Sequence, residues 1–502
     1  MTHEKLRNPA TAAAPLQHPD KLYIDGQWVP ASTGKQISVI SPDTEALYVQ
    51  VAEAGKKDID RAISAARVAF DSGPWPRLSH AARGDFLRAM AEKLKERVAD
   101  MAEIWPHEMG VTHAVSQAFM ARIPGIYNFY AGLGDTFAFE EVRPTSSGIG
   151  NGLLVREPVG VVGAIIPWNA PAMILAYKLA PALIAGCTVV IKSSPEAPAM
   201  ALIIAEVAHL VGIPRGVINV VTADREASDA LVQSPDVDKI TFTGSSAVGK
   251  HIGSVLARRV GRYTLELGGK SAAIVLDDYD IEAAATALAT ASCQMTTQVC
   301  AGLTRIIVSK HRHDAMLEAL AAKYAAVRIG SPFDANTQMG PVASARQRER
   351  IESYIAKGIE DGFTLATGGK RPRHMDRGFF LEPTVFGNVD NGSALAQEEI
   401  FGPVLAVIPA DNEEHAIRIA NDSVYGLSGA VFTNDVDRAY SVARQVRTGT
   451  VAHNAFRNDF SIAFGGFKQS GVGREGGTEG LMPYLETKTI LLDKLPSHQV
   501  HD

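Results

Sequence analysis

Cys300 is the residue of this chain whose setting best suits a nucleophile. It lies in a short glycine-containing turn, 298–302 (QVCAG), between an alanine-rich run that predicts a helix and the apolar stretch 305–308, which predicts a buried strand. The other two cysteines, Cys187 and Cys293, stand in an apolar stretch and at a helix end, where packing is the simpler interpretation. Because a thiolate must reach its electrophile, the sequence favours Cys300 over both of them.

Glu266 is the acid best suited to act as a base. It lies inside the apolar stretch 263–267 (YTLEL), directly before Gly268-Gly269-Lys270. Burial of a carboxylate raises its pKa toward the range in which it can take a proton from water. The alternative is a structural acid paired with Lys270 or with an arginine, and local sequence alone favours that alternative.

Asn169 is a candidate donor to a developing negative charge. It follows Pro167-Trp168 at the end of the predicted strand 159–166. A side-chain amide in such a place can donate to the oxyanion formed in acyl chemistry. Local sequence favours the alternative, in which Asn169 caps the helix that begins near Ala170.

Two strand ends are candidates for a dinucleotide site. The stretch 242–249 (FTGSSAVG) leaves a predicted strand and enters a predicted helix, whose free N–H groups and dipole suit a pyrophosphate. A helix capped by Ser245 is an equally good interpretation. Lys192 ends another predicted strand, where doubly wound sheets bind ligands, although a lysine there is more often simply solvated. The literal G-x-G-x-x-G at 471–476 has no strand–helix–strand unit after it, so it is rejected as a nucleotide motif.

The chain around these candidates alternates predicted strands with predicted helices. After a hairpin at 22–29 around Asp25-Gly26, strands are expected at 159–166, 188–192, 217–221, 239–243 and 263–267, with helices such as 198–210 and 247–259 between them. A second region at about 270–475 is expected to contain helices near 281–293, 311–326, 344–361, 412–421 and 435–446. Such alternation indicates parallel sheets built from β-α-β units.

Composition narrows the class of protein. The 502 residues are too many for one hydrophobic core, and 46% hydrophobic with 21% charged residues is typical of soluble globular proteins. A net charge of −6 gives no support for a surface that binds nucleic acid or anionic membrane. Three cysteines suit a reducing compartment rather than a disulfide framework.

Targeting and metal signals are weak. Residues 1–20 lack the apolar core of a secretory signal, and the longest apolar run, 159–168, has about half of the ~20 residues that a transmembrane helix needs. His311-Arg312-His313 has no metal-ligand spacing to other side chains. We therefore predict a cytoplasmic protein that binds neither membrane nor nucleic acid and holds no metal.

Seven stretches in register resemble motifs of the aldehyde dehydrogenase superfamily. They are Pro167-Trp168-Asn169, Lys192, Phe242-Thr243-Gly244-Ser245, Glu266-Leu267-Gly268-Gly269-Lys270, Gln298-Val299-Cys300, Glu399-Ile400-Phe401-Gly402-Pro403 and Gly465-Gly466-Phe467-Lys468-Gln469-Ser470-Gly471. The resemblance extends over nearly the whole chain. It implies an α/β fold with two doubly wound parallel-sheet domains, one a Rossmann-like cofactor-binding domain and one catalytic, and a small β extension for oligomerisation.

The resemblance also implies domain boundaries. The cofactor-binding domain would consist of residues 1–140 and 158–267, the catalytic domain of 268–476, and the extension of 141–157 with 477–502. In such an extension a strand is added to the sheet of a neighbouring subunit. Because exposed edge strands need a partner, a homodimer or homotetramer is expected.

By this resemblance the candidates acquire roles. Cys300 attacks an aldehyde carbon, and the oxyanion is held by the amide of Asn169 and the backbone N–H of Cys300. Loss of hydride to a nicotinamide leaves a thioester, which water activated by Glu266 hydrolyses to the acid. Lys178 is similar to the family lysine near the oxyanion and proton-relay region.

The implied cofactor is NAD or NADP. The residues expected to bind it are Ile165, Pro167, Trp168, Lys192, Gly244, Ser245, Gly249, Leu267, Glu399 and Phe401. Glu399 and Phe401 resemble the residues that hold the nicotinamide ribose and ring, and Lys192 resembles the ligand of the adenosine ribose. The substrate pocket is expected to be lined by Met173, Ile174, Tyr177, Val299, Ala301, Phe456, Phe460 and Phe464.

Two departures from the family pattern matter. Thr297 stands where the family usually has glycine, and threonine disfavours the positive φ that glycine permits; we predict that the turn tolerates it. Pro195 stands where many NAD-specific members have the glutamate that receives the ribose 2′-hydroxyl, and Glu196 is displaced by one position. This leaves NADP admissible beside NAD.

The pocket residues favour a medium or large apolar aldehyde, aliphatic or aromatic. Apart from Arg122 and Arg457, no arginine is placed to bind a substrate carboxylate.

Two alternative functions predict different outcomes. A CoA-acylating enzyme would transfer the acyl group to CoA, but family members of that type generally lack a base at the position of Glu266. A catalytically silent binding or structural protein would bind cofactor without turnover, which the intact Cys300, Glu266 and Asn169 disfavour.

Overall fold

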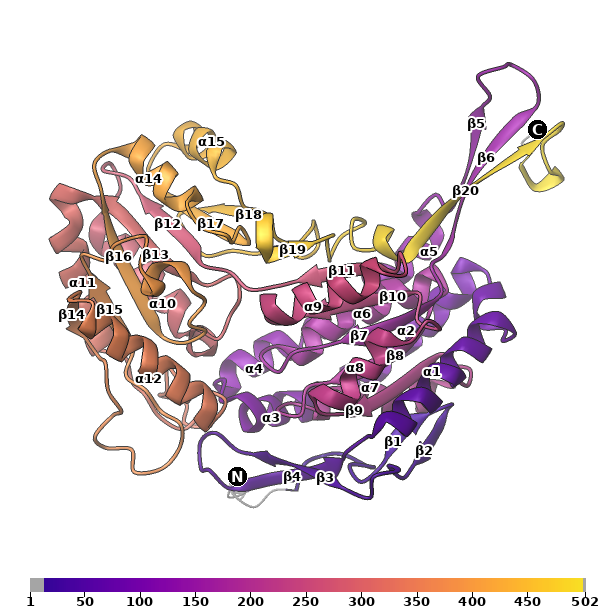
Figure 1. The fold of residues 1–502 in the computed structure, drawn as a ribbon, viewed down its shortest axis with the longest axis horizontal. Coiled ribbons are helices and arrows are strands. Elements are labelled where there is room, and N and C mark those ends of the chain that lie inside the picture. The colour runs from indigo at the N-terminus through magenta and orange to yellow at the C-terminus, as the bar shows by residue number, and fades with distance from the viewer. Residues whose placement is uncertain (1–12, 500–502) are drawn as a thin grey trace, which may run out of the picture.

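Two large sheets carry the fold, and helices pack against both of them (Figure 1). The computed structural model describes residues 13–499. The signal-sequence argument therefore falls partly on residues 1–12, which lie outside the described residues. The α/β class with two parallel-sheet regions, predicted from the sequence, is confirmed.

The first sheet has the strand order β19-β11-β10-β7-β8-β9-β1-β2. Its five central strands run parallel, and they are β11 (Arg262–Glu266), β10 (Lys239–Thr243), β7 (Val161–Ile165), β8 (Thr188–Ser193) and β9 (Ile218–Thr222). All five residues of β7 are buried, as expected for a central strand covered on both faces. The predicted strand 159–166 begins two residues later than expected, because Gly160 has a φ of +129°.

The edges of this sheet are antiparallel. The predicted hairpin is formed by β1 (Leu22–Ile24) and β2 (Gln27–Val29), with positive φ at Asp25 and Gly26 as a type I′ turn requires. At the other edge, β19 (Gly471–Val472) pairs with β11. The rejected glycine motif therefore forms a strand and a turn.

Helices surround the first sheet in chain order. They are α1 (Lys56–Asp71), α2 (His80–Glu96), α3 (Val98–Met109), α4 (His113–Met120), α5 (Ile123–Thr136), α6 (Pro171–Ala185), α7 (Ala199–Val211), α8 (Arg225–Gln233) and α9 (Ser246–Ala257). Helix α6 is buried almost throughout, which its nearly uniformly apolar sequence allows. A separate hairpin, β3 (Gln36–Ile40) with β4 (Leu47–Ala52), lies below this region in Figure 1.

The second sheet has the order β14-β15-β16-β13-β12-β17-β18 and is parallel except for β14. Its strands are β12 (Ser271–Val275), β13 (Leu303–Ser309), β14 (Thr364–Thr367), β15 (Thr384–Gly387), β16 (Val404–Ala410), β17 (Ser428–Phe432) and β18 (Thr450–His453). Its helices are α10 (Ile281–Cys293), α11 (His313–Ala325), α12 (Ala345–Glu360), α13 (Ala394–Gln397), α14 (Glu413–Asn421) and α15 (Val436–Gln445). The five helices predicted here are confirmed with ends that differ by at most two residues.

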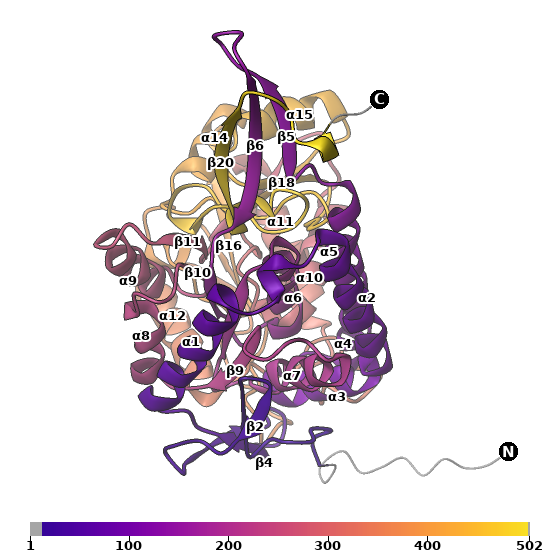
Figure 2. The same cartoon turned by 90° about the vertical axis from the view of Figure 1, so that its right-hand side faces the viewer.

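A three-stranded arm extends from the body of the molecule. It consists of β5 (Glu140–Pro144), β6 (Asn151–Pro158) and β20 (Leu485–Leu492), and Leu154 pairs with Thr489 across its centre. In Figure 2 the arm and the β3–β4 hairpin lie at opposite ends of the molecule. Both outer strands of the arm, β5 and β20, have an unpaired edge within the described chain.

Two possible features are absent from the described part of the chain. No helix within residues 13–499 is long and apolar enough to cross a membrane. Nor do these residues contain three or more His, Cys, Asp or Glu side chains grouped to hold a metal ion.

Candidate active site

Cys300 lies between the short helix η3 (Gln294–Thr297) and β13. The residue as a whole is partly exposed, whereas Cys187 and Cys293 are buried, as the sequence predicted. Its thiol group is nevertheless surrounded by protein, and this burial, followed by the charges of Glu399 and Glu266, raises the pKa of Cys300 to about 12. The thiol is therefore protonated at neutral pH in this arrangement, and it needs a proton acceptor before it can attack.

The turn before Cys300 accommodates Thr297. Its φ is +54°, in the left-handed region that glycine adopts freely. The departure from the family pattern thus leaves the left-handed turn in place, as predicted. Met295 and Thr296 also have positive φ, of 52° and 55°.

Glu266 ends β11, and its side chain is buried with a relative exposure of 3%. Neither carboxylate oxygen has a hydrogen-bond partner within residues 13–499. Burial, and then the charge of Glu475, raises the pKa of Glu266 well above its ordinary value, while Lys178 and Arg474 oppose the rise. The predicted raised pKa is confirmed, and the alternative of an acid paired with Lys270 is wrong.

Lys178 and Glu475 form a buried ion pair beside Glu266. The Lys178 ammonium, on α6, donates to Glu475 and to the hydroxyl of Thr241, which lies 3.3 Å away. Sequence reasoning missed Glu475. The glycine motif that was rejected as a nucleotide site could have drawn attention to Glu475. Gly473 and Gly476 have positive φ, and they turn the chain so that Glu475 reaches the core beside β11.

Asn169 is buried behind the nucleophile turn. Its side-chain Nδ2 donates to the backbone carbonyl oxygen of Gln298 at 3.0 Å, and the backbone carbonyl oxygen of Asn169 accepts from the Trp105 indole N–H at 2.9 Å. Helix α6 has Ala170 as its N-cap and no side-chain cap, so the capping interpretation of Asn169 is wrong. One amide N–H of Asn169 is in use, and the second remains available.

Two glycines allow the elements of the site to approach each other. A Cβ at Gly268 would lie 2.4 Å from Oε2 of Glu399, and a Cβ at Gly269 would lie 2.3 Å from the carbonyl oxygen of Cys300. Glu399 accepts from the backbone N–H of Gly269 at 3.1 Å, and burial raises its pKa to about 7. The Gly268-Gly269 pair therefore places Glu399 and the nucleophile turn against the end of β11.

Lys192 is the most telling of the predicted cofactor residues. It lies on β8 opposite Ile165 of β7 and has a relative exposure of only 8%. Its ammonium has no hydrogen-bond or ion-pair partner in the described residues, and burial lowers its pKa to about 8. The side chain is thus largely buried while its ammonium stays accessible, which leaves the ammonium open to water or to a ligand rich in hydroxyl or phosphate oxygens.

The start of α9 is compatible both with a helix capped by Ser245 and with a binding site for a pyrophosphate. The hydroxyl of Ser245 accepts from the N–H of Val248 at 3.4 Å, so Ser245 is an N-cap. A Cβ at Gly249 would lie 2.5 Å from Leu267, so this glycine lets α9 pack closely on the chain after β11. Gly244 donates its N–H to the carbonyl of Glu266 at 3.0 Å. The helix start therefore lies beside the base, where its free N–H groups suit an anion.

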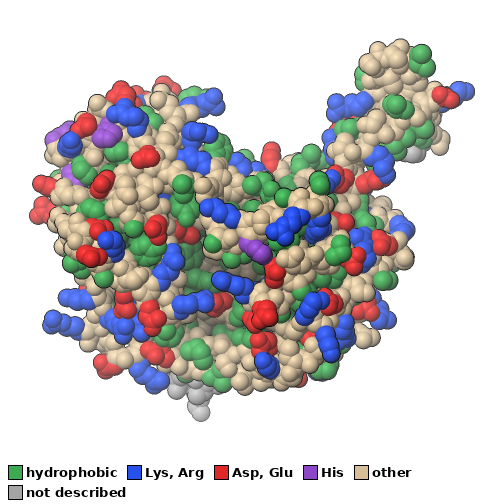
Figure 3. Space-filling view, in the orientation of Figure 1, with side chains coloured by type: hydrophobic (Ala, Val, Ile, Leu, Met, Phe, Trp, Pro, Cys, Tyr) green, Lys and Arg blue, Asp and Glu red, His purple; other side chains and the backbone are tan. Residues whose placement is uncertain are grey.

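The aromatic cofactor candidates lie together, whereas the displaced glutamate Glu196 is occupied elsewhere. Trp168 and Phe401 meet edge to face, with ring centroids 5.3 Å apart, and Phe401 has a φ of +62°. Pro167 stands directly before Trp168 in the link from β7 to α6. Glu196, the displaced glutamate, is already engaged by the Ser194 hydroxyl and, at 2.6 Å, by Arg346. In Figure 3, which has the orientation of Figure 1, the surface of the molecule is hollowed between the part that contains the second sheet and the part that contains the first sheet.

The predicted pocket residues form an aromatic stack beside Cys300. Ring centroids of Tyr177 and Phe460 are 4.7 Å apart, those of Phe460 and Phe464 are 4.2 Å apart, and the planes tilt by 23° and 19°. Phe464 packs in one cluster with Val299, Cys300, Ala301, Leu427, Phe456 and Phe460. Met173 and Ile174 belong instead to the large core of the first sheet, Met173 at its border.

An open groove of about 650 Å³ runs along α10. Phe456 is its one residue in common with the predicted pocket, and neither Cys300 nor Glu266 lines it. The groove is therefore separate from the reacting groups.

Comparison with known proteins agrees with this geometry. The family model described as the aldehyde dehydrogenase family matches residues 28–490. A geranial dehydrogenase of Castellaniella defragrans is 40% identical over 472 residues, 94% of this chain and 98% of that protein. A betaine aldehyde dehydrogenase of Bacillus subtilis is 39% identical, covering 95% and 98%.

Solved structures are equally similar. The crystal structure of a Mycobacterium tuberculosis aldehyde dehydrogenase complexed with NAD+ matches with a TM-score of 0.92 and 44% identity, over 96% of this chain and 99% of that one. Betaine aldehyde dehydrogenase from Staphylococcus aureus in complex with NAD+ matches with a TM-score of 0.93 and 38% identity, over 96% of each chain. The present chain therefore belongs to the aldehyde dehydrogenase family, whose enzymes are oxidoreductases that act on the aldehyde group.

Proposed function

We propose that this enzyme oxidises an apolar aldehyde to its carboxylic acid with NAD or NADP, through a thioester on Cys300 that water hydrolyses. One observation carries the proposal. The buried carboxylate of Glu266 has two unpartnered oxygens and a raised pKa, and its charge acts on the Cys300 thiol. A buried carboxylate without partners costs stability, so a role in proton transfer explains its presence.

Acylation begins when the Cys300 thiol loses its proton. Glu266, the carboxylate of raised pKa whose charge reaches the thiol, is the group we assign to accept it. The thiolate sulfur then bonds to the aldehyde carbon, and the carbonyl oxygen becomes an oxyanion. Asn169 donates its second amide N–H to that oxygen, together with the backbone N–H of Cys300. Loss of hydride from the carbon gives the thioester.

Deacylation returns the enzyme to its starting state. Before this step, the proton that Glu266 took from the thiol passes toward Glu475 and Lys178, whose ion pair lies beside it. The ionised Glu266 then takes a proton from water as the water oxygen bonds to the thioester carbon. The carbon–sulfur bond breaks to release the acid, and the leaving thiolate takes the proton from Glu266. This pathway needs no CoA, and no feature of the described chain favours CoA over water.

The cofactor, when bound, supplies the hydride acceptor. Lys192 would hold the adenosine ribose, and the start of α9 at Gly244, Ser245 and Gly249 would hold the pyrophosphate. Glu399 and Phe401 would hold the nicotinamide ribose and ring, with Trp168 packed against Phe401. Because Glu196 is engaged by Arg346, no glutamate is committed to the ribose 2′-hydroxyl here, and we propose that both NAD and NADP are used.

The aromatic stack supports an apolar substrate. Both faces of Phe460 are covered, one by Tyr177 and one by Phe464, so its negative ring faces are not free to surround a cation. The guanidinium carbon of Arg122 lies over the ring of Phe119, 5.7 Å from its centroid. We expect hexanal and benzaldehyde to exceed both betaine aldehyde and succinic semialdehyde in kcat/KM. A reversed order would contradict the apolar assignment.

Glu266→Gln tests the mechanism. Glutamine cannot take a proton from water, so we expect steady turnover to fall by about 10²–10⁴. If the thioester still forms, one equivalent of reduced cofactor appears as a burst, and mass spectrometry finds the acyl group on Cys300. Wild-type steady turnover by Glu266→Gln, or turnover by Cys300→Ala, would contradict the assignment of these residues.

The assembly and the domain boundaries belong to the same proposal. We propose a cofactor-binding domain of 1–140 and 158–267, a catalytic domain of 268–476 and an extension of 141–157 with 477–502. The free edges of β5 and β20 support a homodimer or homotetramer in which the arm joins a neighbouring sheet. Sedimentation equilibrium tests the subunit number. We also propose a cytoplasmic location, on the low cysteine count.

A further inference from the structure

The left-handed turn at 295–297 is the most unusual backbone near the reacting groups. Three consecutive residues other than glycine, Met295, Thr296 and Thr297, have φ of 52°, 55° and 54°. Two of them are β-branched, a type for which positive φ is rare. All three side chains are buried. Such a conformation persists only where the surroundings fix it, and functional sites are where it concentrates.

Two threonine hydroxyls fix this turn. The hydroxyl of Thr297 donates to the carbonyl oxygen of Ser292, the penultimate residue of α10, at 2.6 Å. The hydroxyl of Thr296 donates to the carbonyl oxygens of Gly340 at 3.1 Å and Pro341 at 3.3 Å. The turn is thus attached on one side to the helix before it and on the other to the loop that precedes α12.

The fixed turn leads directly to the oxyanion donor. The N–H of Gln298 donates to the carbonyl of Met295 at 3.0 Å, and the Gln298 side chain accepts from the N–H of Ala343 at 2.9 Å. The carbonyl of Gln298 accepts the amide of Asn169 at 3.0 Å. A shift of the turn therefore moves both Asn169 and the peptide that leads to Cys300.

Thr297 also supports the far side of the nucleophile. Its methyl group lies 3.6 Å from the position that a Cβ would occupy at Gly302, two residues beyond Cys300. The side chain at the start of the loop that presents the thiol thus lies close to the end of that loop. Glycine would adopt the same φ freely but would provide neither the hydroxyl nor the methyl group.

We propose that Thr297 is a positioning residue for the reaction, whose hydroxyl bond to Ser292 fixes the left-handed turn and with it the placement of Cys300 and Asn169. The inference rests on the proposed roles of these two residues. Thr297 touches no reacting atom; it acts through the turn. Its contribution depends on a hydroxyl that glycine cannot offer.

Three substitutions at position 297 separate the hydroxyl from the backbone. Thr297→Val keeps the shape and loses the hydrogen bond, and because a displacement of about 1 Å can cost roughly a hundredfold, we expect kcat to fall at least about tenfold. Thr297→Ser keeps the hydroxyl and should recover most of the rate. Thr297→Gly removes the backbone strain, so it should fold, yet kcat should remain several-fold below wild type because the bond is missing.

A second readout distinguishes positioning from mere stability. We expect NAD binding, followed by fluorescence titration, to be unchanged in Thr297→Val. Iodoacetamide alkylation of Cys300, located by peptide mapping, should change its pH midpoint by at least about half a unit, because burial and the charges of Glu399 and Glu266 set the pKa of the thiol and a displaced thiol experiences all three differently. Thr290→Val, an exposed threonine of α10 with no hydrogen bond through its side chain, is the matched control.

The outcomes are separable. If Thr297→Val or Thr297→Gly matches wild type in kcat and in alkylation, the positioning role is wrong. It is also wrong if Thr297→Val lowers only the melting temperature while the rate per folded enzyme is unchanged. Turnover by Cys300→Ala would instead contradict the proposed function itself, whatever the behaviour of the Thr297 variants.

Discussion

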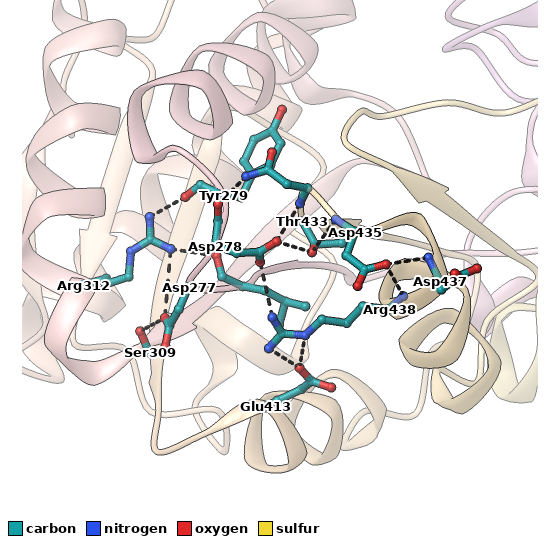
Figure 4. Close-up of polar contacts among 12 residues, drawn as sticks. Asp277, Asp278, Tyr279, Ser309, Arg312, Glu413, Thr433, Asp435, Asp437 and Arg438 are labelled. Atoms are coloured by element: carbon teal, nitrogen blue, oxygen red, sulfur yellow. Dashed lines mark hydrogen bonds and ion pairs between the residues drawn. The ribbon is translucent and has the colours of Figure 1, made fainter.

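Asp278 and Glu266 are carboxylates in opposite surroundings. Asp278 follows β12 and accepts from the hydroxyl of Thr433 and the backbone N–H of Asn434, both at 2.7 Å, with Arg438 at 3.4 Å (Figure 4). Burial alone would raise the pKa of Asp278, but these hydrogen bonds and the arginine lower it. Glu266 has no such partners, and its pKa is raised well above the ordinary value.

The network around Asp278 shows what the fold does with a structural acid. Arg438 is also paired with Glu413 at 2.6 Å, and Arg312 donates to the carbonyls of Leu276 and Tyr279. Figure 4 shows these side chains joining the loop after β12 to α14 and α15. An unpaired buried polar group costs about 1–3 kcal/mol. The chain provides partners for Asp278 and leaves Glu266 without them, and this difference supports the proposed role of Glu266 in proton transfer.

Among substitutions outside the reacting groups, Gly269→Ala should give the largest loss of activity, because the site depends on a close approach of two backbone segments at this glycine. The new Cβ would lie 2.3 Å from the carbonyl of Cys300, so the nucleophile loop must move. We expect kcat to fall about a hundredfold. Steady-state kinetics at matched folded fraction measures it. Gly253→Ala in α9, where a Cβ meets nothing within 4 Å, should retain activity. Equal rates for the two variants would show that the close approach is unimportant.

The pH dependence of turnover should reflect the titration of Glu266 and not that of Asp278. A carboxyl of raised pKa is protonated over a wider pH range, and only its ionised form accepts a proton. On the acid side, kcat should therefore fall about tenfold per pH unit, starting well above the ordinary range for glutamate. The measurement is kcat against pH in wild type and in Glu266→Gln, which should lose this limb. A wild-type rate that stays constant down to about pH 5 would contradict the assignment.

Lys192→Met extends the comparison to a cation. The side chain is largely buried and its ammonium has no hydrogen-bond or ion-pair partner in the described residues, so its replacement by an apolar side chain should raise the melting temperature of the free enzyme. The same change should weaken cofactor binding about tenfold, which corresponds to one charge-assisted hydrogen bond. Calorimetric titration with NAD and NADP measures both dissociation constants. Lys57→Met, an exposed lysine of α1, is the control. Unchanged affinity for both cofactors would show that Lys192 is not a ligand.

The sequence predicted the alternating elements well because their apolar strands and amphipathic helices are local patterns. It also singled out Cys300, the one cysteine in a glycine-containing turn, and Glu266, whose charge conflicts with its apolar neighbours. What it missed depends on distant contacts. Glu475 reaches Lys178 across 297 positions of the chain, and no local pattern predicts that pair.

The local alternatives failed for the same physical reason. Asn169 looks like a helix cap by its neighbours, but it bonds to Gln298, 129 positions away. Lys192 looks solvated at a strand end, yet adjacent strands and the following chain bury it. At Ser245 the local interpretation is correct, since a cap is a contact between residues three apart. Sequence patterns thus predicted short-range contacts, and tertiary contacts determined the rest.

Asp278→Asn should give the smallest effect on activity and a clear effect on stability. The amide loses the charge that faces Arg438, and it cannot accept from both Thr433 and Asn434 as well as the carboxylate does. Because the side chain is about one-third exposed, solvent screens this loss, and we expect about 1 kcal/mol. The melting temperature should fall by about 2 °C, while kcat stays within about twofold of wild type. Asp236→Asn, an exposed aspartate whose side chain bonds to no other residue of the described chain, controls for the change in net charge. The contrary result would be that Asp278→Asn lowers kcat as strongly as Glu266→Gln at unchanged stability. In that case a carboxylate with hydrogen-bond partners would take part in the reaction, and a lack of partners would not distinguish a catalytic acid from a structural one.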